Sequence, residues 1–237
     1  MNKDELELRK GIIAACRAMN SLGVNQGTSG NISARYHDVM LITPSGVPYE
    51  DLKPTDIATM PIKGEYGSWK GPLNPSSEWR FHLDIMRSRP EVGSVVHTHS
   101  TYATTLAICG KEIPAIHYMV AAAGGPNIRV APYATYGTPE LSELALKALE
   151  GRTCCLLRNH GVIATGATIK RALWLAVEIE TLARQYYLSL TIGGAQILPD
   201  DEISRVVEKF KNYGPKAKPT ALKEAAAKSK PAAKRRK

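Results

Sequence analysis

Three histidines stand at the ends of two segments that have the pattern of buried strands. His97 ends the β-branched run at residues 93–97, His99 follows two residues later, and His160 lies in Asn159-His160-Gly161. Alternate residues of an extended chain project to the same side, so the first two imidazoles can face one point together. A third imidazole from a distant segment gives three corners of a tetrahedron around a divalent metal, with a position left for substrate. Histidines with purely structural roles also fit this spacing, so the residues alone leave both interpretations open.

A carboxylate precedes these histidines at the start of a predicted helix. The segment Pro75-Ser76-Ser77-Glu78 introduces a helix of about ten residues that we expect to begin at Ser76 or Ser77. Beside a metal, Glu78 can bind the ion or take a substrate proton as a general base. A glutamate in a first turn also suits the helix dipole. His82, one turn later, is interpreted as a helix-surface or packing histidine.

Three loops of small residues could form an anion pocket. Their backbone N–H groups and short polar side chains can converge on a phosphate with little steric hindrance. None has the phosphate-binding pattern of nucleotide-binding loops, and each alone is an ordinary turn. Three of them on a chain with a candidate metal triad favour a small phosphorylated substrate. The loops are Gly27-Thr28-Ser29-Gly30-Asn31, Thr43-Pro44-Ser45-Gly46 and Pro75-Ser76-Ser77.

The charge of the chain is concentrated at its C-terminal end. The 237 residues carry a net charge of +9, but residues 214–237 hold nine Lys or Arg and only one acid, which leaves about +1 for the rest. The main part is therefore nearly neutral, and nucleic acid is not an expected partner. Residues 214–237 are rich in Lys, Ala and Pro, a composition that predicts a disordered tail, with weak polyanion contact as the alternative.

The compartment is predicted from what the sequence lacks. It has no apolar run of about 18 residues, so no membrane association is expected. The charged start Met1-Asn2-Lys3-Asp4-Glu5 does not resemble a secretory signal. We expect a cytoplasmic protein whose cysteines are reduced thiols. These are Cys16, Cys109, Cys154 and Cys155.

Hydrophobic periodicity gives the fold class. Helices are expected over residues 4–22, about 100–108, 139–150, 168–191 and 199 to about 213, besides the one after residue 75. Strands are expected near 31–35, 39–43, 57–62, 66–70, 93–97, 154–158 and 162–165. The two kinds of element are interleaved without strict alternation. This predicts a single α/β domain at residues 1–213, with a central, mostly antiparallel or mixed β-sheet flanked by helices.

Six motifs, taken in order, closely resemble the class II aldolase/adducin family. The likeness extends from about residue 5 to Tyr213 and leaves out only the basic tail. The motifs are Asn25-Gln26-Gly27-Thr28-Ser29-Gly30-Asn31, Ile42-Thr43-Pro44-Ser45-Gly46-Val47-Pro48, Pro75-Ser76-Ser77-Glu78, Val96-His97-Thr98-His99, Ile113-Pro114-Ala115-Ile116-His117-Tyr118 and Asn159-His160-Gly161.

The resemblance implies a metal site and a phosphate site. One zinc ion per subunit, or another divalent metal, would be held by His97, His99 and His160. Glu78 would be the fourth ligand, and it would become the base when substrate displaces it from the metal. The implied phosphate-binding residues are Gly30, Asn31, Ser45, Gly46, Ser76 and Ser77, with Thr28 close by.

Three tyrosines and the assembly complete the implied site. Tyr118 would reach a neighbouring subunit's active site and handle the proton on the aldehyde-derived oxygen. Tyr213 would lie near the substrate. Tyr136 would lie on the aldehyde side, where a similar family member has phenylalanine. The resemblance implies a homotetramer with four-fold symmetry and active sites between subunits.

The implied reaction is the reversible cleavage of a ketose 1-phosphate. L-Fuculose 1-phosphate is the favoured substrate, giving dihydroxyacetone phosphate and L-lactaldehyde. An aldolase for a 5-deoxypentulose phosphate, a methylthioribulose-phosphate dehydratase and a pentulose-phosphate 4-epimerase are the alternatives, although the epimerases typically carry Asp in the position of Glu78. The adducin branch of the family is a non-catalytic scaffold, and the three histidines argue against that role here.

Overall fold

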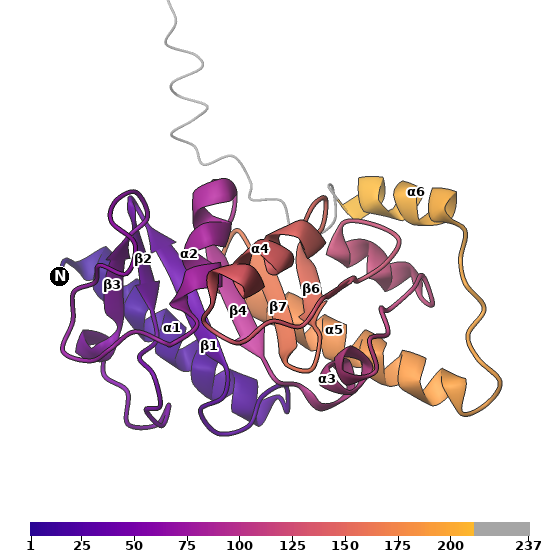
Figure 1. Cartoon of the computed structure of the whole chain (residues 1–237), viewed down its shortest axis with the longest axis horizontal. Coiled ribbons are helices and arrows are strands. Elements are labelled where there is room, and N and C mark those ends of the chain that lie inside the picture. Colours follow the sequence, from indigo (N-terminus) through magenta and orange to yellow (C-terminus); the bar gives the residue numbers. More distant parts are fainter. Residues whose placement is uncertain (211–237) are drawn as a thin grey trace, which may run out of the picture.

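The computed structural model describes residues 1–210, which form one seven-stranded mixed sheet between two layers of helices (Figure 1). The strand order is β3-β2-β1-β4-β7-β6-β5, and every neighbouring pair is antiparallel except β5 with β6. The strands are β1 (Asn31–Tyr36), β2 (Val39–Ile42), β3 (Ala58–Pro61), β4 (Ser94–Thr98), β5 (Val130–Ala131), β6 (Cys154–Leu157) and β7 (Gly161–Gly166). The helices are α1 (Lys3–Ser21), α2 (Trp79–Ser88), α3 (Thr101–Ile108), α4 (Pro139–Ala148), α5 (Ile169–Leu190) and α6 (Asp200–Phe210), with 3₁₀ turns η1 (Pro54–Asp56) and η2 (Tyr118–Ala123).

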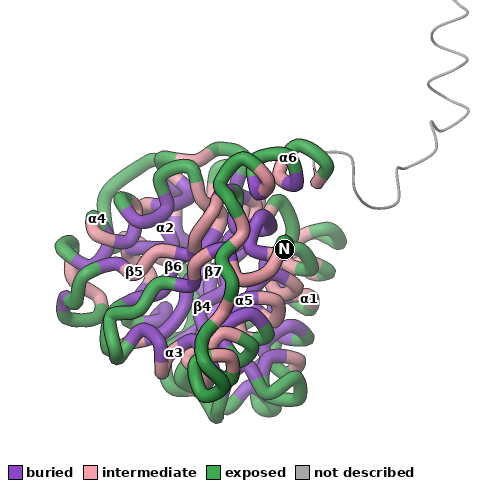
Figure 2. The backbone as a smooth tube through the Cα atoms, turned by 90° about the vertical axis from the view of Figure 1, so that its right-hand side faces the viewer, coloured by how far each residue is buried: buried purple, intermediate pink, exposed green. Residues whose placement is uncertain are grey.

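Alternation along the strands divides the core into two parts. In β4, Val96 packs with residues of α1, α3 and α5 on one face of the sheet, whereas Val95 packs with residues of α2 and α4 on the other. Neighbouring strands follow the same period of two, because side chains in a strand point alternately to the two faces. Figure 2 shows the buried residues gathered in the strands, between exposed outer surfaces and loops. His97, two residues after Val95, therefore points to the α2 face.

The antiparallel register brings the predicted site segments to one end of the sheet. Asn31 at the start of β1 lies opposite His97 of β4. On the other side of β4, Thr98 lies opposite Val162, one residue after the start of β7. The turn between β6 and β7 carries His160. Segments more than 60 residues apart in the sequence therefore meet where β4 ends.

The predicted fold class is confirmed, and so are most of its elements. The strand expected at 66–70 is wrong: only Lys70 pairs, with Thr59, because the chain turns through Gly67 at φ +79°. The short strand β5 was not predicted. Helix α2 begins at Trp79, later than expected, because Ser76 N–H donates to the Thr43 carbonyl at 2.8 Å and Ser77 and Glu78 then form a turn.

The C-terminal predictions fall partly outside the described residues. Helix α6 starts where expected, and its description ends at Phe210. Tyr213 and the tail at 214–237 lie beyond that point, so the domain boundary at 213 and the disordered tail stay predictions. Within residues 1–210, no helix combines the length and apolar character needed to cross a membrane.

Candidate metal centre

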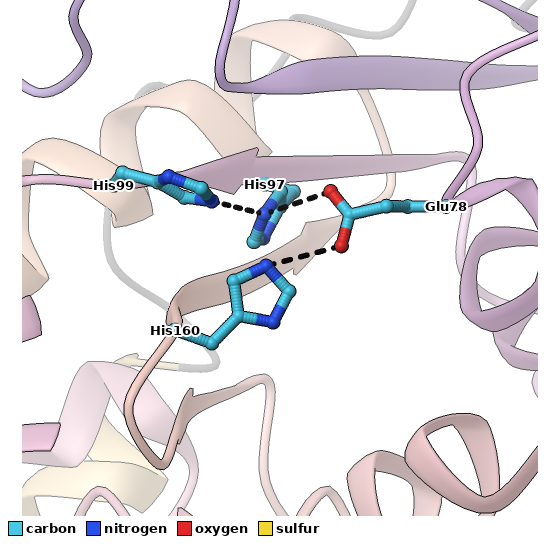
Figure 3. Close-up of side chains that lie close together, drawn as sticks. All are labelled: Glu78, His97, His99 and His160. Carbon is cyan, nitrogen blue, oxygen red and sulfur yellow. Dashed lines mark hydrogen bonds and ion pairs between the residues drawn. The ribbon is translucent and has the colours of Figure 1, made fainter. Parts of the chain in front are cut away.

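Four side chains converge at the end of β4 (Figure 3). His97 Nε2 lies 2.9 Å from His99 Nε2 and 3.1 Å from Glu78 Oε2. His160 Nε2 lies 3.1 Å from Glu78 Oε1. One ligand atom from each of the four residues falls within 4.8 Å of all the others. The structure thus brings together every residue that the sequence predicts as a metal ligand.

A glycine permits this close approach. A Cβ atom on Gly161 would lie 2.4 Å from the Thr98 carbonyl oxygen and 2.8 Å from a ring carbon of His99. The preceding turn passes through Asn159 at φ +54°, the left-handed region that asparagine tolerates better than most residues. The Asn159-His160-Gly161 motif therefore turns the chain sharply and lets the third histidine approach the other two.

The hydrogen bonding of His97 shows that the centre fits a cation. Its Nδ1 lies 2.9 Å from the Val162 carbonyl oxygen, which can only accept, so Nδ1 carries the hydrogen. In the neutral imidazole the Nε2 lone pair is then directed at Glu78 and His99. Glu78 Oε1 is also buried without an aligned hydrogen-bond donor, although His160 lies close. Converging lone pairs of three imidazoles and one carboxylate match the ligand set of divalent zinc.

The ionisation of the centre agrees with metal binding. Burial raises the pKa of Glu78, but the nearby His97 and His160 outweigh this effect and hold it well below its ordinary value. Burial is the main cause that lowers the pKa of His99 to about 4. At neutral pH the carboxylate is therefore anionic and this imidazole neutral, which are the forms that bind metals.

Asn31 is turned toward the metal centre. Its Nδ2 donates to Glu78 Oε2 at 3.0 Å, and its Oδ1 lies 2.5 Å from His82 Nε2. The surface alternative for His82 is wrong, because this residue is fully buried and stacks on Phe81 with ring centroids 4.6 Å apart. Sequence reasoning missed its link to Asn31. The sequence feature that could have indicated this link is the position of His82 one helical turn after Glu78, which places both residues on the same side of α2.

A cavity of about 280 Å³ opens beside the centre. It brings the predicted Ser77 and Tyr136 together with the metal ligands. It also includes Tyr133, which sequence reasoning did not select, and Asn159, which the sequence analysis named only as part of the motif around His160. Tyr133 stands three residues before Tyr136 in the same loop, and no pattern in the sequence sets it apart. The lining residues are Ser77, Glu78, His99, Tyr133, Ala134, Tyr136, Asn159 and His160.

The three small-residue loops lie around the same end of the sheet. Ser45 N–H donates at 3.1 Å to the carbonyl of Asn74, the residue before the third loop, and Ser76 N–H donates to the Thr43 carbonyl, so the second and third loops are hydrogen-bonded together. Ser76 Oγ accepts from the Glu78 N–H at 3.3 Å. A Cβ on Gly30 would lie 2.6 Å from the His97 carbonyl, so the first loop is packed directly against β4. Thr28, Ser45 and Gly46 are exposed, while Ser76 is buried.

Several predicted site residues do not line this cavity: Thr28, Gly30, Asn31, Ser45, Gly46 and Ser76 lie outside its lining, and so does Tyr118. Tyr118 lies in η2, is half-exposed, and packs on His117 with ring centroids 4.7 Å apart. It is absent from the residues that line the cavity beside Glu78. Its predicted action in a neighbouring subunit stays a prediction, as does the role of Tyr213, which lies outside the described residues.

Comparison with known proteins places the chain in a family. The model for the class II aldolase and adducin N-terminal domain matches residues 10–187. A 5-methylthioribulose-1-phosphate/5-deoxyribulose-1-phosphate aldolase of Rhodospirillum rubrum is 55% identical over 217 residues, covering 92% of this chain and 97% of the relative. L-Fuculose phosphate aldolase of Escherichia coli K12 is 49% identical over 209 residues, covering 88% and 96%. The structure of an L-fuculose 1-phosphate aldolase aligns with a TM-score of 0.83 and 38% identity, covering 89% of this chain and 98% of that one.

The chain belongs to the class II aldolase/adducin family. Its fold is that of the class II aldolases, and its enzymatic class is that of the lyases. Class II aldolases use a divalent metal, and the cluster of Glu78, His97, His99 and His160 can hold one.

Proposed function

We propose that this protein reversibly cleaves a ketose 1-phosphate into dihydroxyacetone phosphate and a small aldehyde. The observation that carries the proposal is the arrangement of Glu78 and three histidines beside a cavity that also contains Ser77 and Tyr136. The names of relatives that are 49% and 55% identical support the same reaction type.

The buried carboxylate is the proposed proton-transfer group. In cleavage, the bond between carbons 3 and 4 of the ketose breaks, and its electron pair passes toward the carbonyl at carbon 2. Glu78, released from the cluster by substrate, takes up a proton from solvent and delivers it to carbon 3, while the hydroxyl on carbon 4 gives up one proton; in the reverse direction Glu78 removes the proton from carbon 3. A divalent metal at the cluster would supply Lewis-acid polarisation of the substrate oxygens.

The other residues are proposed to bind and orient the substrate. The loops that contain Thr28, Gly30, Asn31, Ser45, Gly46, Ser76 and Ser77 would hold the phosphate and fix carbon 3 relative to Glu78. Tyr118 of a neighbouring subunit would exchange the proton of the hydroxyl on carbon 4. This assignment requires an oligomer, for which we propose a homotetramer. We propose zinc as the metal because three imidazoles and one carboxylate are typical zinc ligands.

Two substrates are candidates for the proposed reaction. L-Fuculose 1-phosphate would yield L-lactaldehyde, which carries a hydroxyl group. A 5-methylthio- or 5-deoxyribulose 1-phosphate would yield an aldehyde without one. The relative at 55% identity favours the second substrate, and so do the aromatic ring of Tyr133 and the methyl group of Ala134, which can contact an apolar chain. Tyr136 offers a hydroxyl that could serve the first.

A single assay tests both the reaction and its metal. The purified protein is incubated with each ketose phosphate, and dihydroxyacetone phosphate is measured by coupled NADH oxidation, with and without chelator. We expect release that stops with chelator and returns with zinc. The ratio of kcat/KM values for the two substrates identifies the preferred aldehyde. If the zinc-loaded protein releases no product from either, the proposed function is wrong, and epimerisation of pentulose phosphates is tested next.

A further inference from the structure

A directed chain of hydrogen bonds extends from the sheet to the catalytic carboxylate. Ser33 and Asn31 occupy alternate positions of β1, so both side chains point toward α2. Ser33 Oγ lies 2.7 Å from His82 Nδ1, and His82 Nε2 lies 2.5 Å from Asn31 Oδ1. Asn31 Nδ2 completes the chain at 3.0 Å from Glu78 Oε2. All four residues are buried.

The direction of each bond follows from what its atoms can do. A carboxylate oxygen only accepts, so the Asn31 amide must present its NH₂ group to Glu78. Its carbonyl oxygen then faces His82 and requires a donor, which places a hydrogen on His82 Nε2. Burial lowers the pKa of His82 to about 3, so the ring is neutral and Nδ1 has only a lone pair. Ser33 O–H therefore donates to Nδ1, and one consistent assignment satisfies the whole chain.

We propose that His82 is a positioning residue that fixes the orientation of the Asn31 amide and thereby keeps an N–H donor on Glu78. If the amide turned over, its oxygen would face the Glu78 carboxylate and its NH₂ group would face the His82 N–H. The first contact would be repulsive in a buried site, and so would the second as long as His82 carries its hydrogen on Nε2. The inference rests on the proposed function, in which Glu78 is a metal ligand and the proton-transfer group. His82 itself does not line the cavity.

Two substitutions separate hydrogen bonding from packing at this position. His82→Leu removes the donor, whereas His82→Gln keeps a side-chain N–H that can reach Asn31. We expect His82→Leu to lower Co²⁺ affinity and kcat by about 10- to 100-fold, the usual range for outer partners of metal ligands, with KM unchanged. His82→Gln should recover most of both losses. Ile85→Val, at a fully buried position of the same helix, is the control for loss of packing.

A double-mutant cycle tests whether the effect passes through Glu78. Co²⁺ affinity, measured by absorbance titration, is compared for His82→Leu in the native and the Glu78→Gln backgrounds. We expect a clear loss in the first and little further loss in the second. Equal losses in both backgrounds would overturn the proposal, as would native kcat and Co²⁺ affinity in His82→Leu.

A second variant keeps the proposal testable if His82→Leu does not fold. Ser33→Ala leaves His82 in place but removes the hydroxyl that hydrogen-bonds to its Nδ1 and helps hold the ring, so Co²⁺ affinity should fall in the same direction by a smaller factor. Native affinity in Ser33→Ala would contradict the proposal. The Co²⁺ titrations use no substrate, so they distinguish failure of this inference from failure of the native enzyme to cleave either ketose phosphate.

Discussion

The metal centre and the rim of its cavity are built in opposite ways. Glu78 and His97 are at most 5% exposed and are fixed by strand register and hydrogen bonds. Tyr133 and Tyr136, at the opening of the same cavity, are 59% and 63% exposed and belong to a loop between β5 and α4. The cavity therefore has one rigid wall and one solvated wall.

This difference separates the chemistry from the choice of substrate. A group that transfers a proton must be held within a fraction of an ångström, which only packed elements with satisfied hydrogen bonds can do. A side chain that merely contacts the aldehyde can sit on a loop, where replacement costs little stability. We expect substitutions in the centre to abolish the reaction of every substrate, and substitutions at the rim to change the ratio between substrates.

Gly161→Ala should disrupt the metal centre more than any other substitution considered. The added methyl group would overlap the Thr98 carbonyl and the His99 ring, so His99 and His160 could no longer approach each other. We expect loss of stoichiometric zinc, measured by metal analysis, and loss of detectable cleavage. Gly11→Ala is the matched control, because its Cβ would meet only Ile169 at an ordinary 3.6 Å. A zinc-replete, active Gly161→Ala protein would contradict the packing argument.

Glu78→Gln should leave the fold around the metal centre intact and remove the carboxylate that transfers the proton. The amide has nearly the same shape but cannot accept a proton from carbon, so kcat should fall by about 10²–10⁴-fold. Circular dichroism and size-exclusion chromatography should match the native protein. Turnover close to native would refute the role of the carboxylate and direct attention to another base.

Tyr118→Phe tests a residue that lies neither in the metal centre nor at the rim of the cavity of its own chain. If its hydroxyl acts on the aldehyde oxygen in a neighbouring subunit, cleavage should slow by roughly 10²-fold, the low end for general acid–base groups. Exchange of the carbon-bound proton of dihydroxyacetone phosphate with solvent should slow much less, because Glu78 transfers that proton and no aldehyde oxygen takes part. Equal losses in the two assays would argue against this assignment.

The contrast between the two walls also explains what could be predicted from the sequence. The metal ligands are recognisable because their residue types are rare and their spacing follows the period of a strand, as in His97 and His99. The β-branched content of residues 93–97 likewise predicted the central strand β4. The late start of α2 at Trp79 escaped prediction, because it depends on pairing of Ser76 with Thr43, a contact between segments distant in sequence.

The tertiary roles of two residues were likewise hidden. His82 looks like any polar residue on a helix until β1 is known to pack over it and supply Ser33 and Asn31. Tyr133 has no periodic or compositional mark, since its position depends on where the β5–α4 loop crosses the cavity. The sequence pattern around a residue therefore predicts which side chains can react. Which side chains hydrogen-bond to them or cover them depends on how the sheet, the helices and the loops pack.

Tyr133→Ala should give the smallest effect and sharpen the comparison most. Loss of the ring removes an apolar contact for the chain of a 5-methylthio substrate more than for the hydroxylated end of L-fuculose 1-phosphate. Because the position is more than half exposed, we expect the kcat/KM ratio to shift by about 2- to 10-fold toward L-fuculose 1-phosphate, below the discrimination of a closed pocket. Tyr133→Phe, which keeps the ring, should keep the native ratio, and proton exchange of dihydroxyacetone phosphate should be unchanged in both variants. A parallel loss of exchange in Tyr133→Ala would show that the rim also positions the reacting carbon, and the division between the two walls would then fail.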